Sequence, residues 1–302
     1  MLSLHTNAAA LSAQNSISRT QNSLSTSMTR LSTGYRINSA MDDAAGLQIA
    51  TRLKTQTSGM AVAMRNTQNS ISLMQTAEGA LDETTNILNR MKDLATQAAD
   101  GSSTAADQTA MQKEFNSLTD ELSNIFSNTK FGGTELFKGG AAGKLTAAIT
   151  FQIGADMTET MNGDFTAELT DVVAKIGAAA TGYSDTTSAT PSAGNDISDA
   201  GGTNSAAGAT AANATIKDLA DAIDSVGALR SKLGAVSNRL DHVYNNLSNI
   251  STNTKNATGR IMDVDFAGES ATMTSNQMLL QAGTAMLKQT NSQSSLVLSL
   301  LQ

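Results

Sequence analysis

The sequence lacks cysteine and tryptophan, has a single proline, and contains only 3% aromatic residues among its 302. Without cysteine it can form neither a disulfide framework nor a cysteine-ligated metal site. Few large aromatic side chains are available to fill a compact core, whereas the leucine, isoleucine, methionine and alanine that are present suit long helices packed along narrow seams. The lone proline, Pro191, leaves the rest of the chain almost free of helix breakers.

Positive charge is also scarce. The net charge is -7, the pI is about 4.8, and lysine and arginine nowhere form a cluster, which argues against a nucleic-acid partner. No stretch approaches the roughly 18–20 apolar residues of a membrane helix. The first 16 residues do not have the basic and then apolar pattern of a cleavable signal peptide. We therefore expect a soluble chain with no membrane partner, and export, if it occurs, by a route that reads no such signal.

The common catalytic and ligand-binding motifs are missing as well. His5 and His242 lie far apart and lack the spacing of metal ligands. No His-Glu-x-x-His, Gly-x-Ser-x-Gly or Walker sequence occurs, and the glycine pairs at 132–133 and 139–140 are typical of turns. We expect no enzyme activity, no bound metal and no cofactor.

Apolar residues recur with helical spacing over most of the chain. The pattern predicts helices over residues 4–31, 42–100, 107–128, 216–261 and 265–302. Residues 130–140 lose this period and are typical of a turn with a short strand. Residues 148–161 alternate between apolar and polar around Gly154-Ala155-Asp156, which predicts a β-hairpin.

The two helices predicted at the ends of the chain carry very little charge. Arg19 and Arg30 are the charged residues of the first, and the rest of its surface is small or polar and uncharged. We expect these helices to pair antiparallel through an apolar seam and to bury their other faces only when many copies stack. The predicted seam consists of Leu4, Leu11, Leu24, Leu31, Phe266, Met273, Leu280, Leu287 and Leu301.

Blocks at both ends of the chain resemble bacterial flagellins. Residues 31–53, LSTGYRINSAMDDAAGLQIATRL, and 75–101, QTAEGALDETTNILNRMKDLATQAADG, resemble the flagellin N-terminal signature. The predicted hairpin, ITFQIGADMTET, looks like the flagellin hairpin region, and residues 233–269 and 277–302 resemble the C-terminal block. Only residues 166–213 fall outside the resemblance.

The predicted fold is mainly α: a long antiparallel helical-bundle or coiled-coil rod with paired N- and C-terminal helices, a small β-hairpin region and a short variable insert. The expected parts are an N-terminal inner-core helix (1–43), a long-helix domain in two pieces (44–176 and 214–258), a variable surface insert (177–213) and a C-terminal inner-core helix (259–302). The insert has almost no large apolar side chain, so we expect it to be exposed and to bury no core. Its composition leaves O-glycosylation of residues 181–206 open.

The resemblance implies a structural subunit that polymerises into the bacterial flagellar filament for motility. It also implies unfolded export by the flagellar type III apparatus to the extracellular flagellum. The implied partners are further copies of the chain in a helical homopolymer, a flagellar export chaperone and the filament cap. A hook–filament junction or other flagellar axial protein is the alternative, and would match less closely over residues 31–101. A non-flagellar coiled-coil adhesin or secretion tip protein is a third reading.

The resemblance further implies recognition by innate immune receptors of a host. Arg90, Leu94 and Glu114 match in type the positions by which flagellins contact the Toll-like flagellin receptor. The segment read by the cytosolic NAIP sensors corresponds to Val297, Leu298, Leu300 and Leu301.

Overall fold

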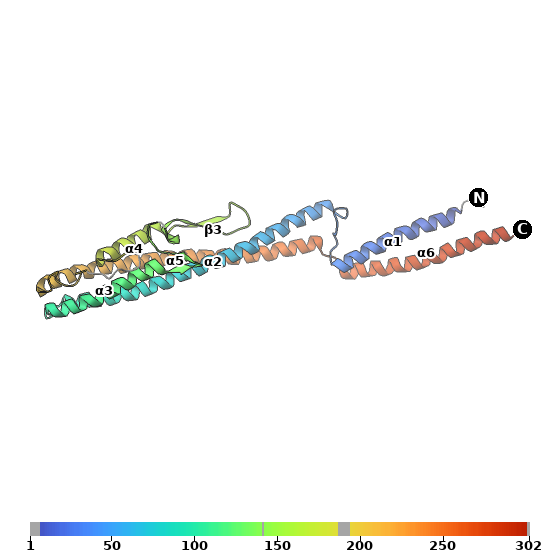
Figure 1. Cartoon of the computed structure of the whole chain (residues 1–302). Helices are drawn as coiled ribbons and strands as arrows, with labels where there is room; N and C mark the ends of the chain where they lie inside the picture. Colours follow the sequence, from blue (N-terminus) through green and yellow to red (C-terminus); the bar gives the residue numbers. More distant parts are fainter. Residues whose placement is uncertain (1–6, 141, 187–193, 301–302) are drawn as a thin grey trace. The chain divides into compact units, whose positions relative to one another are not determined.

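The computed structural model describes residues 7–140, 142–186 and 194–300, and only the backbone of residues 293–300. Within these ranges the chain is mainly helical, with two short β-hairpins (Figure 1). The helices are α1 (Ala8–Thr33), α2 (Ala44–Ala98), α3 (Ala105–Asn128), α4 (Thr166–Ala179), α5 (Ser205–Met262) and α6 (Phe266–Leu300). The strands are β1 (Lys130–Phe131), β2 (Thr134–Glu135), β3 (Ile149–Gln152) and β4 (Thr160–Gly163), and a 3-10 turn covers Lys144–Thr146.

The chain divides into two compact units. Unit 1 comprises residues up to 58 and from 250 onward, and unit 2 comprises residues 59–249. Helices α2 and α5 each contribute to both, so the chain passes between the units inside two long helices. Among the described residues, none of the helices has both the length and the apolar character needed to cross a membrane.

Unit 2 is built on the antiparallel pair of α2 and α5. Asp82 of α2 lies 3.0 Å from Arg230 of α5, and further along Met60 packs with Leu247. The helical spacing predicted for residues 42–100 is confirmed along α2, where residues alternating by four and three positions form a buried stripe. The stripe includes Met60, Thr67, Ile71, Met74, Ala77, Leu81, Thr84, Leu88, Met91, Ala95 and Ala98.

A short turn reverses the chain between α2 and α3, so that the two helices pack side by side. Thr104 caps α3 by accepting a hydrogen bond from the backbone N–H of Asp107, whose carboxylate accepts in return from the Thr104 backbone N–H. This reciprocal cap satisfies two backbone donors at the helix start. It also places the first helical residue at Ala105, two residues before the predicted start at 107. Helix α3 then buries Phe115, Leu122 and Phe126.

Helix α4 docks on α5 through both polar and apolar contacts. The Lys232 Nζ lies 2.6 Å from a Glu168 carboxylate oxygen, and the Ser225 hydroxyl donates to Asp171 at 2.6 Å. Leu169, Val172 and Ile176 are buried beneath these pairs.

The expectation that residues 177–213 bury no core is wrong. Ala179, Ala180, Ile197 and Ala212 are all buried, and α5 begins at Ser205 rather than near residue 214. Alanine fits between closely spaced helices without a large side chain, so composition underestimates the core here. The backbone N–H of Ile197 donates to a side-chain oxygen of buried Gln112 at 2.7 Å, which ties the segment to α3. Residues 187–193 lie outside the described chain.

The predicted hairpin is confirmed. Strands β3 and β4 pair antiparallel, with Ile149 opposite Gly163 and Gln152 opposite Thr160. A second hairpin joins β1 and β2 through Gly132 and Gly133, whose φ angles of 57° and 84° are those that a tight two-residue turn requires. Each hairpin reverses the chain between helices of unit 2.

Phe126 centres the aromatic part of the unit 2 core. It is fully buried, and its ring centroid lies 5.3 Å from that of Phe137 and 5.8 Å from that of Tyr183. Because Phe126→Ala leaves a cavity beside the Phe137 and Tyr183 rings, we expect it to lower the free energy of unfolding by about 3–5 kcal/mol. Urea denaturation followed by far-ultraviolet circular dichroism would measure this.

The matched control is Met157→Ala at the tip of the β3–β4 hairpin, where the side chain is exposed. We expect its unfolding free energy to stay within about 0.5 kcal/mol of the unaltered chain. Equal losses from both substitutions would contradict the assignment of the core.

Candidate functional site: the terminal helix pair and its connectors

Helices α1 and α6 pair antiparallel inside unit 1, as the sequence predicts. Near one end, the Asn7 side-chain amide donates to the Thr290 carbonyl at 3.4 Å. At the other end, Arg30 lies 3.7 Å from Glu269. The pairing is visible where α1 and α6 run side by side in Figure 1.

The seam between these helices is narrower and more polar than predicted. Ser27 is the one buried residue of α1, which is described throughout. A side-chain carbon at Gly283 would meet the Ile17 Cγ1 at 2.9 Å, so the absence of a Cβ allows the helices to approach closely there. Five predicted seam residues are half-buried in the pair: Leu24, Leu31, Met273, Leu280 and Leu287.

Two predicted seam residues lie outside the seam, namely Leu11, which is 64% exposed, and Phe266, which is 57% exposed. Thirteen residues separate Leu11 from Leu24, and at about 100° per residue this rotates Leu11 to the far side of α1. Phe266 is the first residue of α6, at the end of the pair where α1 stops. Leu4 and Leu301 fall outside the described residues.

The outward faces of the pair keep large apolar side chains in solvent. Leu11 and Met28 of α1 and Met278, Leu279 and Met286 of α6 are each more than half exposed. Single exposed apolar residues are ordinary, but these lie on two helices with very few charges, so the pair has an unusually apolar and uncharged exterior.

The two connectors of unit 1 pair with each other. Gly34 ends α1 in a left-handed conformation, with φ at 76°, and its carbonyl accepts from the backbone N–H of Val264 at 3.0 Å. The backbone N–H of Arg36 donates to the carbonyl of Met262, and Tyr35 and Asp263 form an antiparallel bridge. The segment that follows α1 and the segment that precedes α6 are therefore joined by one short ladder of backbone hydrogen bonds.

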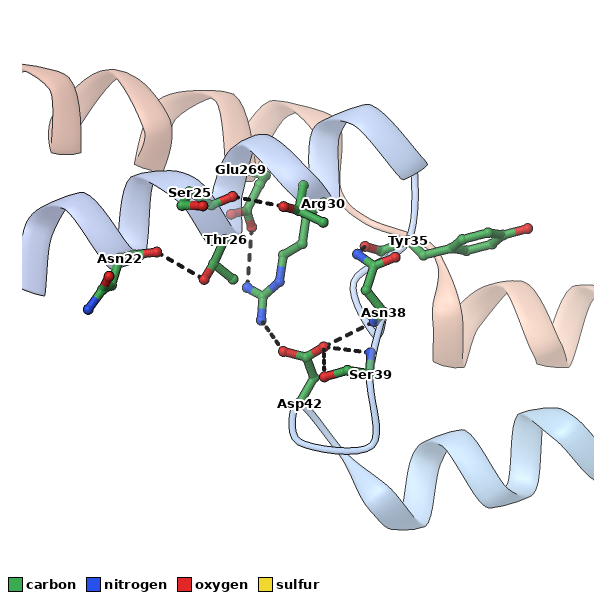
Figure 2. A network of polar contacts seen from close by, with 10 residues as sticks. Asn22, Ser25, Thr26, Arg30, Tyr35, Asn38, Ser39, Asp42 and Glu269 are labelled. Carbon is green, nitrogen blue, oxygen red and sulfur yellow. Dashed lines mark hydrogen bonds and ion pairs between the residues drawn. The ribbon is translucent and has the colours of Figure 1, made fainter.

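An ion network holds this ladder to the terminal pair (Figure 2). The Arg30 guanidinium lies between Glu269 of α6, at 3.7 Å, and Asp42 of the α1–α2 connector, at 4.0 Å. Asp42 in turn accepts hydrogen bonds from the backbone N–H groups of Asn38 and Ser39, at 3.1 and 2.9 Å. Arg30 therefore links both terminal helices to the connector.

Sequence reasoning missed this network and assigned Asp42 to the first turn of the second helix. The helix begins at Ala44 because Asp43 caps it, accepting from the backbone N–H of Gly46 at 2.9 Å. Asp42 is thereby left to the connector. The available signal was Arg30 itself, one of only two charged residues in a helix of 26.

The three residues matched to the Toll-like receptor contact divide between surface and core. The Arg90 Nη2 lies 2.7 Å from a Glu114 carboxylate oxygen, and both side chains are about half exposed, which puts the pair on one face of α2 and α3. Leu94 is only 2% exposed and packs in the core of unit 2, so its side chain does not share that face. Of the NAIP segment, the side chains of Val297, Leu298 and Leu300 and all of Leu301 lie outside the described residues.

Neither histidine takes part in a catalytic or metal constellation that the structure describes. His242 is exposed on α5, and His5 lies outside the described chain. Across the described ranges, no group of three or more potential metal ligands comes together.

The Asp42 network predicts an acid-sensitive connector. Hydrogen bonds from the Ser39 and Asn38 backbone N–H groups, the Ser39 hydroxyl and then the charge of Arg30 hold the pKa of Asp42 below its ordinary value. A lowered pKa in the folded chain means that the carboxylate stabilises the connector fully above the ordinary pKa of aspartate. That stabilisation is lost as the pH falls through the lowered value.

We therefore expect hydrogen-exchange protection of the connector amides of Asn38 and Ser39, corrected for intrinsic rates, to fall in acid. Asp42→Asn should lower protection at neutral pH about tenfold and remove the acid dependence. Asp93→Asn, at an exposed position of α2, is the control and should leave both unchanged. An acid dependence that survives in Asp42→Asn would assign the effect to another group.

Comparison with known proteins identifies the family to which this architecture belongs. The family model of the bacterial flagellin N-terminal helical region matches residues 4–142, and that of the C-terminal helical region matches residues 216–301. The two models together span well over half of the chain.

Individual relatives agree with this assignment. Flagellin C of Vibrio cholerae is 49% identical over 160 residues, which are 53% of this chain and 41% of that protein. B-type flagellin of Pseudomonas aeruginosa is 49% identical over 161 residues, 53% of this chain and 32% of that protein. The matched part of this chain therefore spans less than half the length of either relative.

A solved structure of Bacillus cereus flagellin is 31% identical, with a TM-score of 0.44 over 61% of this chain and 88% of that one. Flagellins are structural proteins rather than enzymes. The two family models, placed in order at the two ends of the chain over the helices described above, show that the chain belongs to the bacterial flagellin family.

Proposed function

We propose that this chain is a structural subunit that polymerises into the extracellular bacterial flagellar filament. The observation that carries the proposal is the exterior of the α1–α6 pair. Leu11, Met28, Leu279 and Met286 are exposed there on two helices with almost no charge, and these helices pack against each other within unit 1. The pair has different exposed apolar faces that only other copies can bury. Contacts between unlike faces of successive copies are heterologous, and their repetition builds open helical assemblies.

The parts of the chain have different places in this proposal. Residues 1–43 and 259–302 form the inner core of the tube, and residues 44–176 and 214–258 form the long-helix domain around it. Residues 177–213 are the variable insert, and part of it, including Ala180 and Ile197, packs in the core of unit 2. Burial supports this division, because unit 2 has a core of its own, whereas most of the described residues of the terminal pair are exposed.

Export belongs to the same proposal. The chain passes unfolded through the flagellar type III apparatus, with an export chaperone inside the cell and the filament cap outside. The weak seam of the terminal pair supports this, because a helix that buries little in its own subunit is marginal in water and unfolds at little cost.

A hook–filament junction or other flagellar axial protein is the alternative function. The 49% identity to proteins named flagellin C and B-type flagellin favours the filament subunit over a junction protein.

We further propose that the face carrying Arg90 and Glu114 is the contact for a host Toll-like flagellin receptor. The exposed pair offers adjacent opposite charges, and buried Leu94 fixes α2 beneath them. A surface pair of this kind adds little to stability, so its removal should act on binding rather than on folding. Recognition of the C-terminal segment by NAIP sensors is part of the same proposal.

The filament proposal predicts that the purified chain, seeded with filament fragments, elongates into long tubes visible by electron microscopy. Deletion of residues 266–302 should abolish elongation, because it removes α6 and exposes its partner. It should leave the thermal unfolding of unit 2 unchanged, since α6 lies in unit 1. Tubes from the truncated chain would refute the role of the pair, and closed rings from the full chain would refute the filament.

The receptor proposal predicts that Arg90→Ala or Glu114→Ala lowers signalling on the order of tenfold in reporter cells, because either change removes one side of the charged contact. Lys217→Ala, on an exposed residue of α5, is the control and should signal normally. Circular dichroism would verify that all three variants fold. Unaltered signalling by both test variants would remove the assignment.

A further inference from the structure

Methionine supplies the most oxidisable side chains that this protein exposes. The chain has 14 methionines and no cysteine or tryptophan. Met60, Met74, Met91 and Met161 are buried. Among the described residues, the methionines with the most exposed side chains are Met28, Met41, Met157, Met278 and Met286. Thioether oxidation follows exposure, so the structure separates a reactive set from a protected one.

Met286 differs from the other exposed methionines because it lines a groove. A groove of about 460 Å³ runs between α1 and α6, with Ala9, Ala13 and Ile17 on one side and Leu279, Ala282 and Met286 on the other. No residue that lines it is charged. Met278 is equally exposed on the same helix but does not line the groove.

The occupant that fits this groove is a second copy of the chain. In this respect the inference rests on the proposed filament function. A wall of alanine, serine and threonine admits the close approach of a helix, and the absence of charge requires an uncharged partner. The α1–α6 pair presents such a surface itself at Leu11 and Met28, which are exposed and lie outside the groove lining. One copy therefore carries both the groove and an apolar face that can enter it.

We propose that the Met286 thioether is a reversible oxidation site whose conversion to the sulfoxide blocks docking of a second copy in the α1–α6 groove. Hydrogen peroxide is the oxidant. A sulfur lone pair attacks one peroxide oxygen, the S–O bond forms and the O–O bond breaks, and the proton on the transferred oxygen passes to the departing hydroxide to give water. The thioether is oxidised to the sulfoxide and the peroxide is reduced.

The sulfoxide is polar, whereas the thioether is apolar, and docking in the uncharged groove depends on this difference. The sulfoxide oxygen is a strong hydrogen-bond acceptor that a docked helix would take out of water. The hydroxyls of the groove threonines Thr20 and Thr290 already donate to backbone carbonyls of their own helices. Methionine sulfoxide reductases with a thiol return the sulfoxide to the thioether, which makes the block reversible.

Two matched full-length variants isolate Met286. The first carries Met28→Leu, Met41→Leu, Met157→Leu and Met278→Leu, so that Met286 is the most exposed thioether left among the residues that the structure describes. The second carries the same changes and Met286→Leu. Both are treated with hydrogen peroxide, the modified residues are mapped by peptide mass spectrometry, and seeded elongation is followed by electron microscopy and light scattering.

Peptide mapping should find Met286 oxidised in the first variant while Met60, Met74 and Met91 stay unmodified. Oxidation should raise the critical concentration for elongation of the first variant by about tenfold or more. It should leave that of the second within about twofold, and reductase with dithiothreitol should restore the first. Met286→Gln in the otherwise unaltered chain, which places a polar amide in the groove without any oxidant, should slow elongation in the same direction.

Equal sensitivity of the two variants to peroxide would overturn the proposal, as would normal elongation of a first variant shown to be oxidised at Met286. Failure of the untreated, unaltered chain to elongate would overturn the filament function and this proposal together. Elongation of the untreated chain with no effect of Met286 oxidation would overturn this proposal alone.

Discussion

Side-by-side packing of antiparallel helices through narrow seams is the interaction on which both units depend. With three tyrosines, seven phenylalanines and no tryptophan, the chain has few bulky groups with which to fill wide gaps. Alanine, leucine and methionine at helical spacing bring the helix backbones close together instead, as along Met74, Ala77 and Leu81 of α2. Close approach of long helices buries enough apolar surface without a globular core.

The same interaction has a different strength in the two units. In unit 2, α3 and α4 cover faces that the α2–α5 pair leaves open, and residues such as Leu88, Leu122 and Leu219 are completely buried. In unit 1, α1 and α6 pack against each other, and α1 buries only Ser27. Unit 2 is therefore complete within one chain, whereas the terminal pair gains most from contacts outside it. This difference gives a structural reason for an assembly role at the ends of the chain.

The connectors add a polar constraint to a pair that is weakly held by apolar burial. Arg30 and Glu269 come from opposite ends of the chain, and their charges meet that of Asp42, which lies in the connector following α1 (Figure 2). Directional contacts of this kind specify geometry, because they are satisfied in few arrangements. Apolar seams, in contrast, tolerate sliding by a helical turn. The network thus joins both terminal helices to the α1–α2 connector at one end of the pair.

The sequence by itself determined the helices other than α4, the β3–β4 hairpin and the antiparallel pairing of the ends, because helical period and strand alternation are local properties of consecutive residues. Helix α4 was not predicted. It also determined the family, through blocks at both ends. Only the tertiary structure decided that Leu11 faces solvent, that Leu94 is buried and that Ile197 belongs to the core. Each of these depends on which neighbour covers a face, and spacing along one helix does not contain that information. The meeting of Arg30 with Glu269, 239 residues later, likewise appears only after the chain has folded.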